Sequence, residues 1–127
     1  MGKITGLGGV FIKADHPKEL ADWYQEVLGI WFNGNPYTVF PFTDEENKVH
    51  PGFNILSFFE SNSTYFAPSD KPAMLNLRVE GLEALLERLR SEGVTVVGEP
   101  MIEEYGNFGW ILDPEGNKIE LWEPPIS

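Results

Sequence analysis

The sequence contains no cysteine. Disulfide bonds, thiolate nucleophiles and cysteine-based zinc or iron–sulfur sites are therefore excluded. It also lacks any apolar run of the about 20 residues that a membrane-spanning helix needs. Histidine is scarce, since His16 and His50 are the only two, and both fall in predicted turns where they more often serve as caps than as ligands. We expect a cytoplasmic protein.

Basic residues are few: 9 Lys and Arg stand against 20 Asp and Glu, for a net charge of -11. Such a surface repels nucleic acids and anionic membranes, so neither is expected as a partner. It would attract a cationic ligand, although acidity also serves solubility alone. The 127 residues, 42% of them hydrophobic, suffice for one sizeable core. We therefore expect a single domain over residues 1–127.

The most informative stretch covers residues 106–122. Residues 113–117, with the sequence DPEGN, predict a tight turn, because Pro and Gly supply the required backbone angles while Asp and Asn bond their own backbone. Side chains alternate along the two flanking strands. A hairpin symmetric about Glu115 would place three pairs on one face: Trp110 with Glu120, Phe108 with Trp122, and Leu112 with Lys118.

The first half of the chain predicts one strand, one helix and three further strands. Residues 7–14 alternate as a half-buried strand does. Residues 17–28 predict an amphipathic helix, with Pro17 in the first turn and Gly29 as its stop. Short β-branched or aromatic runs then predict strands at residues 30–32, 37–42 and 53–59.

The second half repeats this order after a Ser- and Pro-rich linker at residues 61–72. A strand is predicted at residues 74–79 and a helix at residues 81–92. Three further strands are predicted at residues 94–97, 108–112 and 118–122. The chain thus divides into module one (1–60), the linker and module two (73–127), each module a βαβββ unit. Met74 falls on Gly9 and Gly93 on Gly29 at nearly the same offset, which indicates an internal repeat.

We therefore predict an α+β fold in which the two modules form a curved mixed sheet that encloses a cleft. In every strand that can be phased, one side is aliphatic and the other is polar and aromatic. The aliphatic side suits a helix on the outer face of each module. The other side would line the cleft, where a ligand would bind.

Three features together resemble the vicinal oxygen chelate superfamily: the paired βαβββ repeat, a first helix that carries the Trp23–Tyr24 pair and ends in VLGI at residues 27–30, and a closing strand-turn-strand with the sequence DPEGNKIELWE at residues 113–123. That superfamily includes glyoxalase I, bleomycin-resistance proteins and extradiol dioxygenases. The chain is most similar to its small, single-domain, glyoxalase-like members. The resemblance implies a small-molecule ligand and a homodimer.

Metal-dependent members of that superfamily bind a divalent cation with one residue from each of four strands. In this sequence those positions fall on Gly9, near Ser57, on Met74 and on Glu120. Only Glu120 is a suitable ligand, because glycine has no side chain and a thioether suits a hard cation poorly. We expect no metal and no other cofactor. A divalent ion would need Glu60 and His50 to join Glu120.

The resemblance and the hairpin together select the candidate site residues. Glu120 is the candidate catalytic group, as a general base or as an anchor for a ligand. Trp110 and Trp122 could stack on a planar or cationic molecule. Arg78 could instead neutralise Glu120. The candidate substrate-binding residues are Phe11, Ser57, Phe59, Asn76, Arg78, Phe108, Trp110 and Trp122.

The first functional hypothesis is a metal-free binding protein of the glyoxalase and bleomycin-resistance type, which takes a planar or cationic ligand in an aromatic cleft. The alternative is a glyoxalase-like lyase or isomerase, or a dioxygenase-related enzyme, that uses Glu120 as a base or a metal ligand. A non-catalytic interaction module is the second alternative. The residues leave open whether the protein is an enzyme.

Overall fold

The computed structural model describes residues 2–43 and 49–125. It is an α+β fold with one seven-stranded mixed sheet and two helices. The strands are β1 (Lys3–Ala14), β2 (Tyr37–Thr43), β3 (Val49–Glu60), β4 (Ala73–Glu80), β5 (Met101–Glu103), β6 (Gly106–Leu112) and β7 (Lys118–Glu123). The helices are α1 (Pro17–Leu28) and α2 (Leu82–Ser91). No helix in the described parts is long and apolar enough to cross a membrane.

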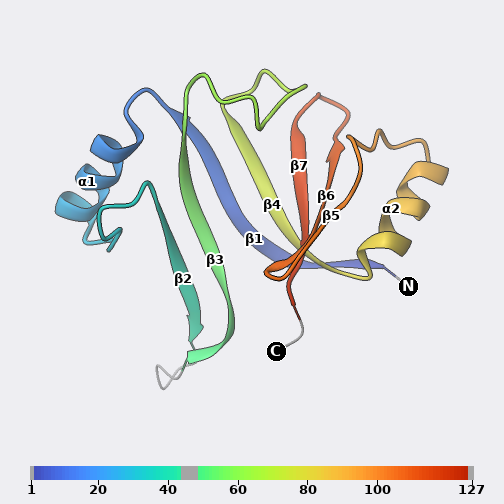
Figure 1. The fold of residues 1–127 in the computed structure, drawn as a ribbon, viewed down its shortest axis with the longest axis horizontal. Helices are drawn as coiled ribbons and strands as arrows, with labels where there is room; N and C mark the ends of the chain where they lie inside the picture. The colour runs from blue at the N-terminus through green and yellow to red at the C-terminus, as the bar shows by residue number, and fades with distance from the viewer. Residues whose placement is uncertain (1, 44–48, 126–127) are drawn as a thin grey trace.

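The sheet is built symmetrically around its centre, with the order β2-β3-β1-β4-β7-β6-β5 (Figure 1). In each half a parallel pair lies innermost, β1 with β3 and β4 with β7, and the strands outside it pair antiparallel. The halves are joined by antiparallel pairing of β1 with β4. The α+β class and the duplicated arrangement predicted from the sequence are confirmed.

The predicted hairpin is confirmed in its register. Trp110 pairs with Glu120, Phe108 with Trp122 and Leu112 with Lys118. Asp113 holds the turn, since its carboxylate accepts hydrogen bonds from the backbone N–H groups of Glu115 and Asn117, each at 2.9 Å. A further bond from the Asn117 side chain is the largest cause that lowers the pKa of Asp113. The Asp113 carboxylate therefore stabilises the fold above its unfolded pKa, and this contribution is lost as pH falls through the lower folded value.

The strand predicted at residues 30–32 is wrong. After α1 ends at Gly29, which adopts a positive φ of 73°, the chain forms an irregular connection to β2. The backbone N–H of Phe32 donates to the Gln25 side chain at 2.9 Å rather than to a neighbouring strand. Phe32 is buried at 2% exposure beside Phe58 and Ala21. Phe32 thus fills the core under α1 and Ile30 packs against it, while Trp31 between them is 68% exposed, so the run has the composition of a strand without being one.

The strand predicted at residues 94–97 is also wrong, because only a single bridge from Val96 to Ile111 forms there. Two flanking backbone bonds join Val97 to Trp110 and Leu112 to Thr95. Gly98, at a positive φ of 66°, follows directly. The edge strand of this half is instead the short β5, which pairs with the beginning of β6.

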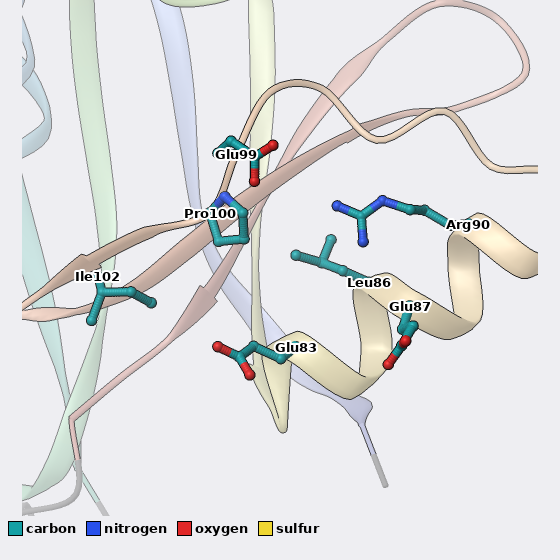
Figure 2. A pocket seen from close by; sticks show the side chains of 7 residues that line it. All are labelled: Glu83, Leu86, Glu87, Arg90, Glu99, Pro100 and Ile102. Carbon is teal, nitrogen blue, oxygen red and sulfur yellow. The ribbon is translucent and has the colours of Figure 1, made fainter.

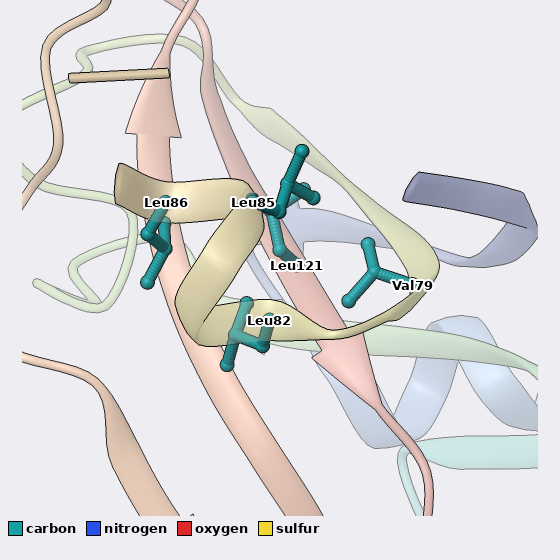
Figure 3. Packing of buried hydrophobic residues seen from close by; sticks show 5 residues of the cluster. All are labelled: Val79, Leu82, Leu85, Leu86 and Leu121. Atoms are coloured by element: carbon teal, nitrogen blue, oxygen red, sulfur yellow. The ribbon is translucent and has the colours of Figure 1, made fainter. Parts of the chain in front are cut away.

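Both helices pack on the same side of the sheet, one on each module, and they lie at opposite ends of the molecule in Figure 1. Under α2, Leu82, Leu85 and Leu86 contact Val79 and Leu121 (Figure 3). All five of these side chains are at most 2% exposed. The leucines at helical spacing therefore form the core under α2, as the amphipathic pattern predicted.

The N-terminus of α2 is capped from the end of β7. The Glu123 carboxylate accepts hydrogen bonds from the backbone N–H groups of Gly81 at 2.9 Å and Leu82 at 3.3 Å. These N–H groups have no partner within the helix, and the helix dipole favours a negative charge there. Glu123 therefore ties the last strand to the second helix.

Replacing Glu123 with alanine is expected to lower the free energy of unfolding by about 1 kcal/mol, the typical value of a lost N-terminal cap. Urea unfolding followed by circular dichroism measures the change. Glu83→Ala is the matched control, because Glu83 lies in the first turn of the same helix without capping it. Equal losses in the two variants would contradict the capping role.

We call the sheet surface opposite the helices the inner face. It carries Phe11, Met74, Asn76, Arg78, Trp110, Glu120 and Trp122. Residues 61–72, predicted as a linker, fold back onto this face at the top of Figure 1. Phe66 from this segment is fully buried, at 0% exposure, against Phe11 and Met74. The connection is therefore part of the packing of the inner face.

Candidate functional site

The Glu120 carboxylate is the centre of a buried polar cluster on the inner face. The residue is 2% exposed. The Asn76 side chain donates to its Oε1 at 2.6 Å, the Trp110 indole N–H donates to Oε2 at 3.0 Å, and the Tyr65 hydroxyl also donates to Oε2. Three neutral donors thus satisfy most of the hydrogen-bonding capacity of one buried carboxylate.

The three donors come from different parts of the chain. Asn76 and Trp110 lie on β4 and β6, the strands that flank β7, and each is paired in register with Glu120. Their positions are therefore fixed by the sheet. Tyr65 lies on the connection at residues 61–72, outside the strands. It is the donor that can leave without breaking a strand pair.

The Tyr65 phenol is held in its protonated state. Burial raises its pKa, and the nearby negative charge of Glu120 together with the hydrogen bond to that carboxylate raises it further. The ring stacks on Phe59 at 5.6 Å between centroids and meets Trp110 edge to face. The phenol is therefore a hydrogen-bond donor throughout the neutral range.

Lys118 is a second charged group in the cluster. Its ammonium donates to the backbone carbonyl of Tyr65 at 2.6 Å, and it lies over the rings of Tyr65 and Trp110. Burial lowers the pKa of Lys118, while the charge of Glu120 opposes this shift. The ammonium thus fastens the connection at residues 61–72 to β7 and partly offsets the charge of Glu120.

The Asn76 side chain leaves one acceptor unused. Its Oδ1 is buried and finds no hydrogen-bond partner among the described residues. It points towards Gly8 of β1, where an added Cβ would lie 1.9 Å from this oxygen. Glycine at position 8 is therefore required for Asn76 to reach Glu120.

A second aromatic cluster lies further along the inner face. Trp122 stacks parallel to Phe108 at 6.4 Å and contacts Phe53 at 5.3 Å between ring centroids. Arg78 lies over Trp122 and forms no ion pair with Glu120. Within the described residues, its side chain donates one hydrogen bond, to the Phe53 carbonyl at 3.4 Å. The neutralisation of Glu120 by Arg78 that the sequence left open is absent.

The remaining predicted binding residues divide between two places. Phe11 is 7% exposed and packs on Phe59 at 5.3 Å between centroids, beside the Glu120 cluster. Ser57 and Phe59 border a hollow of about 720 Å³ near the end of β3 and the start of α1. Ser57 makes no hydrogen bond with the Glu120 cluster in the described parts of the chain.

The positions that carry metal ligands in the superfamily do not fit a divalent ion here. An added Cβ at Gly9 would lie 2.2 Å from the backbone oxygen of Ile55, so this position leaves no room for a longer side chain. Met74 is 1% exposed among Phe11 and Phe66. Among the described residues, no group of three His, Cys, Asp or Glu side chains gathers closely enough to hold an ion.

Glu60, the second carboxylate of the alternative ion site, does not lie beside Glu120. Glu60 is exposed at the end of β3, where it borders a hollow with Asp15, His16 and Lys18. The side chain of His50 lies outside the described residues. Glu60 therefore lies near α1 rather than near Glu120.

A separate hollow of about 410 Å³ lies between α2 and the segment that leads into β5 (Figure 2). Three of its seven lining residues are acidic, and the full lining is Glu83, Leu86, Glu87, Arg90, Glu99, Pro100 and Ile102. It contains none of the predicted site residues, and it belongs to the outer side of the second module.

Two residues that complete the cluster were weakly predicted or missed: the sequence offered Tyr65 as a shape and hydrogen-bond candidate without a specific signal, and it gave Lys118 no role in the site. Lys118 could have been found, because the predicted hairpin already places it on the same face as Glu120, two residues away. Tyr65 carried a weaker signal, an aromatic pair with Phe66 inside an otherwise polar connection.

Comparison with known proteins identifies related folds. The profile of a family described as a glyoxalase-like domain matches residues 9–122. No curated protein matches the chain. Among solved structures, a methylmalonyl-CoA epimerase from Streptomyces coelicolor, in complex with 2-nitronate-propionyl-CoA, is similar with a TM-score of 0.69 and 15% identity, over 98% of this chain and 100% of that one.

Two further structures show the same fold. Methylmalonyl-CoA epimerase from Mycobacterium tuberculosis has a TM-score of 0.65 and 22% identity, over 97% of this chain and 90% of that one. A glyoxalase/bleomycin resistance protein/dioxygenase superfamily member from Vibrio splendidus has a TM-score of 0.55 and 10% identity, over 95% and 99% of the two chains. At these identities the likeness concerns the fold alone.

Proposed function

Because the chain belongs to the glyoxalase-like domain family, we propose that it binds a small planar molecule on the inner face of its sheet, without a metal ion. Glu120 would accept a hydrogen bond from this ligand. The observation that carries the proposal is the set of protein donors on Glu120, where other members of the superfamily place a cation. A carboxylate that accepts hydrogen bonds from neutral donors can also accept one from an O–H or N–H group of a ligand.

The ligand would take the place of the Tyr65 phenol. Tyr65 presents a flat ring between Phe59 and Trp110 and a hydroxyl to Glu120. A planar molecule with one donor group has the same shape and polarity. Its binding would move Tyr65, which no strand pairing holds.

Of the two ligand classes expected from the sequence, the geometry favours the planar one over the cationic one. The Lys118 ammonium already lies over the Tyr65 and Trp110 rings. A second cation there would meet like-charge repulsion, which costs more where burial lowers the effective dielectric constant. A neutral donor avoids this cost.

The enzymatic alternative uses the same carboxylate as a base. A base must reach the proton that it removes from its substrate. Here Tyr65, Asn76 and Trp110 all donate to Glu120, and the residue is 2% exposed. Catalysis would need the same displacement of Tyr65 that binding needs, and in addition a substrate proton placed against Glu120, so binding is the simpler proposal.

Thermal shift and calorimetric titration with phenol, indole and benzyltrimethylammonium test the proposal. Phenol or indole is expected to bind, and Glu120→Gln is expected to weaken that binding about tenfold or more, since a hydrogen bond to a charged group is lost. Tyr65→Phe is expected to tighten it, because the internal competitor no longer bonds to Glu120.

Glu115→Gln is the matched control, because Glu115 is an exposed residue of the turn at residues 113–117. It removes the same charge and should leave the affinity unchanged. Equal affinity for phenol in wild type and Glu120→Gln would remove Glu120 from the site. Absence of binding by all three probes would count against the function.

A further inference from the structure

Arg78 presents a guanidinium on the inner face at a distance from the Glu120 cluster. It follows Asn76 by two residues on β4, and its partner Trp122 follows Glu120 by two residues on β7. Side chains two apart on a strand share a face and are about 6.6 Å apart along it. Arg78 therefore lies on the same surface as Glu120, about two residues further along the paired strands.

Aromatic rings fix the position of this guanidinium. Its central carbon lies 5.3 Å from the ring centroid of Phe42 and 5.2 Å from that of Trp122. Such contacts are favourable for an arginine cation and restrict its movement. Gly52 contributes the space, since an added Cβ there would lie 2.9 Å from the Phe42 ring and 3.2 Å from Nη2 of Arg78.

The N–H groups of Arg78 are mostly unused. An arginine carries five of them, and they point outward in the plane of the guanidinium. The contact to the Phe53 carbonyl, at 3.4 Å, is at the long limit for a hydrogen bond. Within residues 2–43 and 49–125 no carboxylate forms an ion pair with Arg78, and the ion pair found there joins Lys3 to Glu80 at the surface.

This arrangement is unusual in a chain with 20 acidic and 9 basic residues. Acidic side chains outnumber arginines and lysines, so a structural role for Arg78 would readily be met by an ion pair. A half-buried guanidinium that is held by rings, and whose donors are mostly unused by the described residues, is instead prepared for an anion that comes from outside. The half-buried rings of Phe53 and Phe108, which pack on the buried Trp122, offer a surface for a flat, apolar group.

We infer that Arg78 is the anion-recognition group of the inner face, and that the ligand is an aromatic molecule with a carboxylate or phosphate group that pairs with the guanidinium. This inference extends the proposed function. It rests on that proposal in one respect, because the ligand must occupy the inner face. It assigns the orientation of the ligand. A hydrogen-bond donor lies near Glu120, an oxyanion lies at Arg78, and the aromatic body lies between them.

Benzoate, phenyl phosphate and the neutral analogue benzamide test the inference by titration of the full chain, followed by amide NMR shifts and calorimetry. Wild type is expected to bind benzoate or phenyl phosphate more tightly than benzamide, and the tighter of the two anions identifies the group recognised. Arg78→Gln is expected to weaken binding of that anion about tenfold or more, without weakening benzamide binding.

Arg78→Lys and Arg88→Gln complete the design. Lysine keeps the charge but cannot form the paired hydrogen bonds, so Arg78→Lys should also bind the anion more weakly than wild type. This variant provides the test if Arg78→Gln fails to fold. Arg88 is exposed on α2, and Arg88→Gln removes the same charge, so it should bind the anion as wild type does.

Three results would overturn the inference: no binding of either anion, equal affinity for benzamide and the preferred anion, or equal anion affinity in wild type and both Arg78 variants. Phenol separates this outcome from failure of the proposed function. If phenol binding depends on Glu120 but anion binding is unchanged in the Arg78 variants, the inference is refuted and the proposed function stands. Anion binding that depends on Arg78 while phenol binding ignores Glu120 would refute the role of Glu120 alone.

Discussion

Replacing Glu120 with alanine is expected to lower the free energy of unfolding by about 3 kcal/mol or more, because three donors lose their partner and a buried donor left unsatisfied costs about 1–3 kcal/mol. Asn76 is 2% exposed, and its amide would lose its hydrogen bond to the carboxylate. The Tyr65 hydroxyl and the Trp110 N–H would lose theirs as well. Urea unfolding at neutral pH, followed by tryptophan fluorescence, measures the loss.

Two further variants separate the hydrogen bonds from the charge. Glu120→Gln keeps one carbonyl oxygen as an acceptor, so it should lower the free energy of unfolding less than Glu120→Ala does. Glu115→Ala removes an exposed carboxylate from the turn of the same hairpin and should change stability by no more than about 0.5 kcal/mol. A loss below about 1 kcal/mol in Glu120→Ala would show that the cluster contributes little to the folded state.

Phe66→Ala is the second substitution with a large expected effect, a loss of about 3–5 kcal/mol, which is typical of a deleted core phenylalanine. The side chain is 0% exposed and packs on Phe59 at 5.1 Å between ring centroids. The ammonium of Lys13 also lies over its ring at 5.3 Å. The same urea titration measures the change.

Tyr105→Ala is the control, because Tyr105 is an aromatic residue that is 60% exposed. Tyr105→Ala should lower the free energy of unfolding much less than Phe66→Ala does. A loss of similar size in both variants, or one below about 1 kcal/mol for Phe66→Ala, would mean that residues 61–72 only connect the modules. A large loss would establish the connection as part of the core, and would imply that Tyr65 moves while Phe66 stays in place.

The elements with strong periodic signals were predicted correctly from the sequence. The hairpin register follows from the alternation of side chains around a turn whose residues allow little choice, and Trp110 does pair with Glu120. The first helix does end at Gly29, in the left-handed conformation that glycine favours. In both cases neighbours in the sequence determine the geometry.

The errors fall where distant residues decide the outcome. Residues 30–32 and 94–97 have the composition of strands, but a strand also needs a partner along its length. Phe32 instead fills the core beneath α1, and Val96 forms only one bridge to β6. Short apolar runs do not distinguish these cases.

The candidate site was predicted in part. Glu120, Asn76 and Trp110 do meet, and strand alternation suffices to place them on one face. Their contact with Tyr65 depends on the path of a connection that has no periodic pattern. The homodimer, the cytoplasmic location and the choice between binding and catalysis stay predictions.

The close approach of β3 to β1 at Gly9 bears on how this chain relates to metal-using members of its superfamily. The backbone oxygen of Ile55 occupies the space that a Cβ at position 9 would need, at 2.2 Å. Histidine introduced there would have to push two paired strands apart before it reached any ion. A metal site that used position 9 would thus require several coordinated changes in the central strands, so no single substitution there would create one.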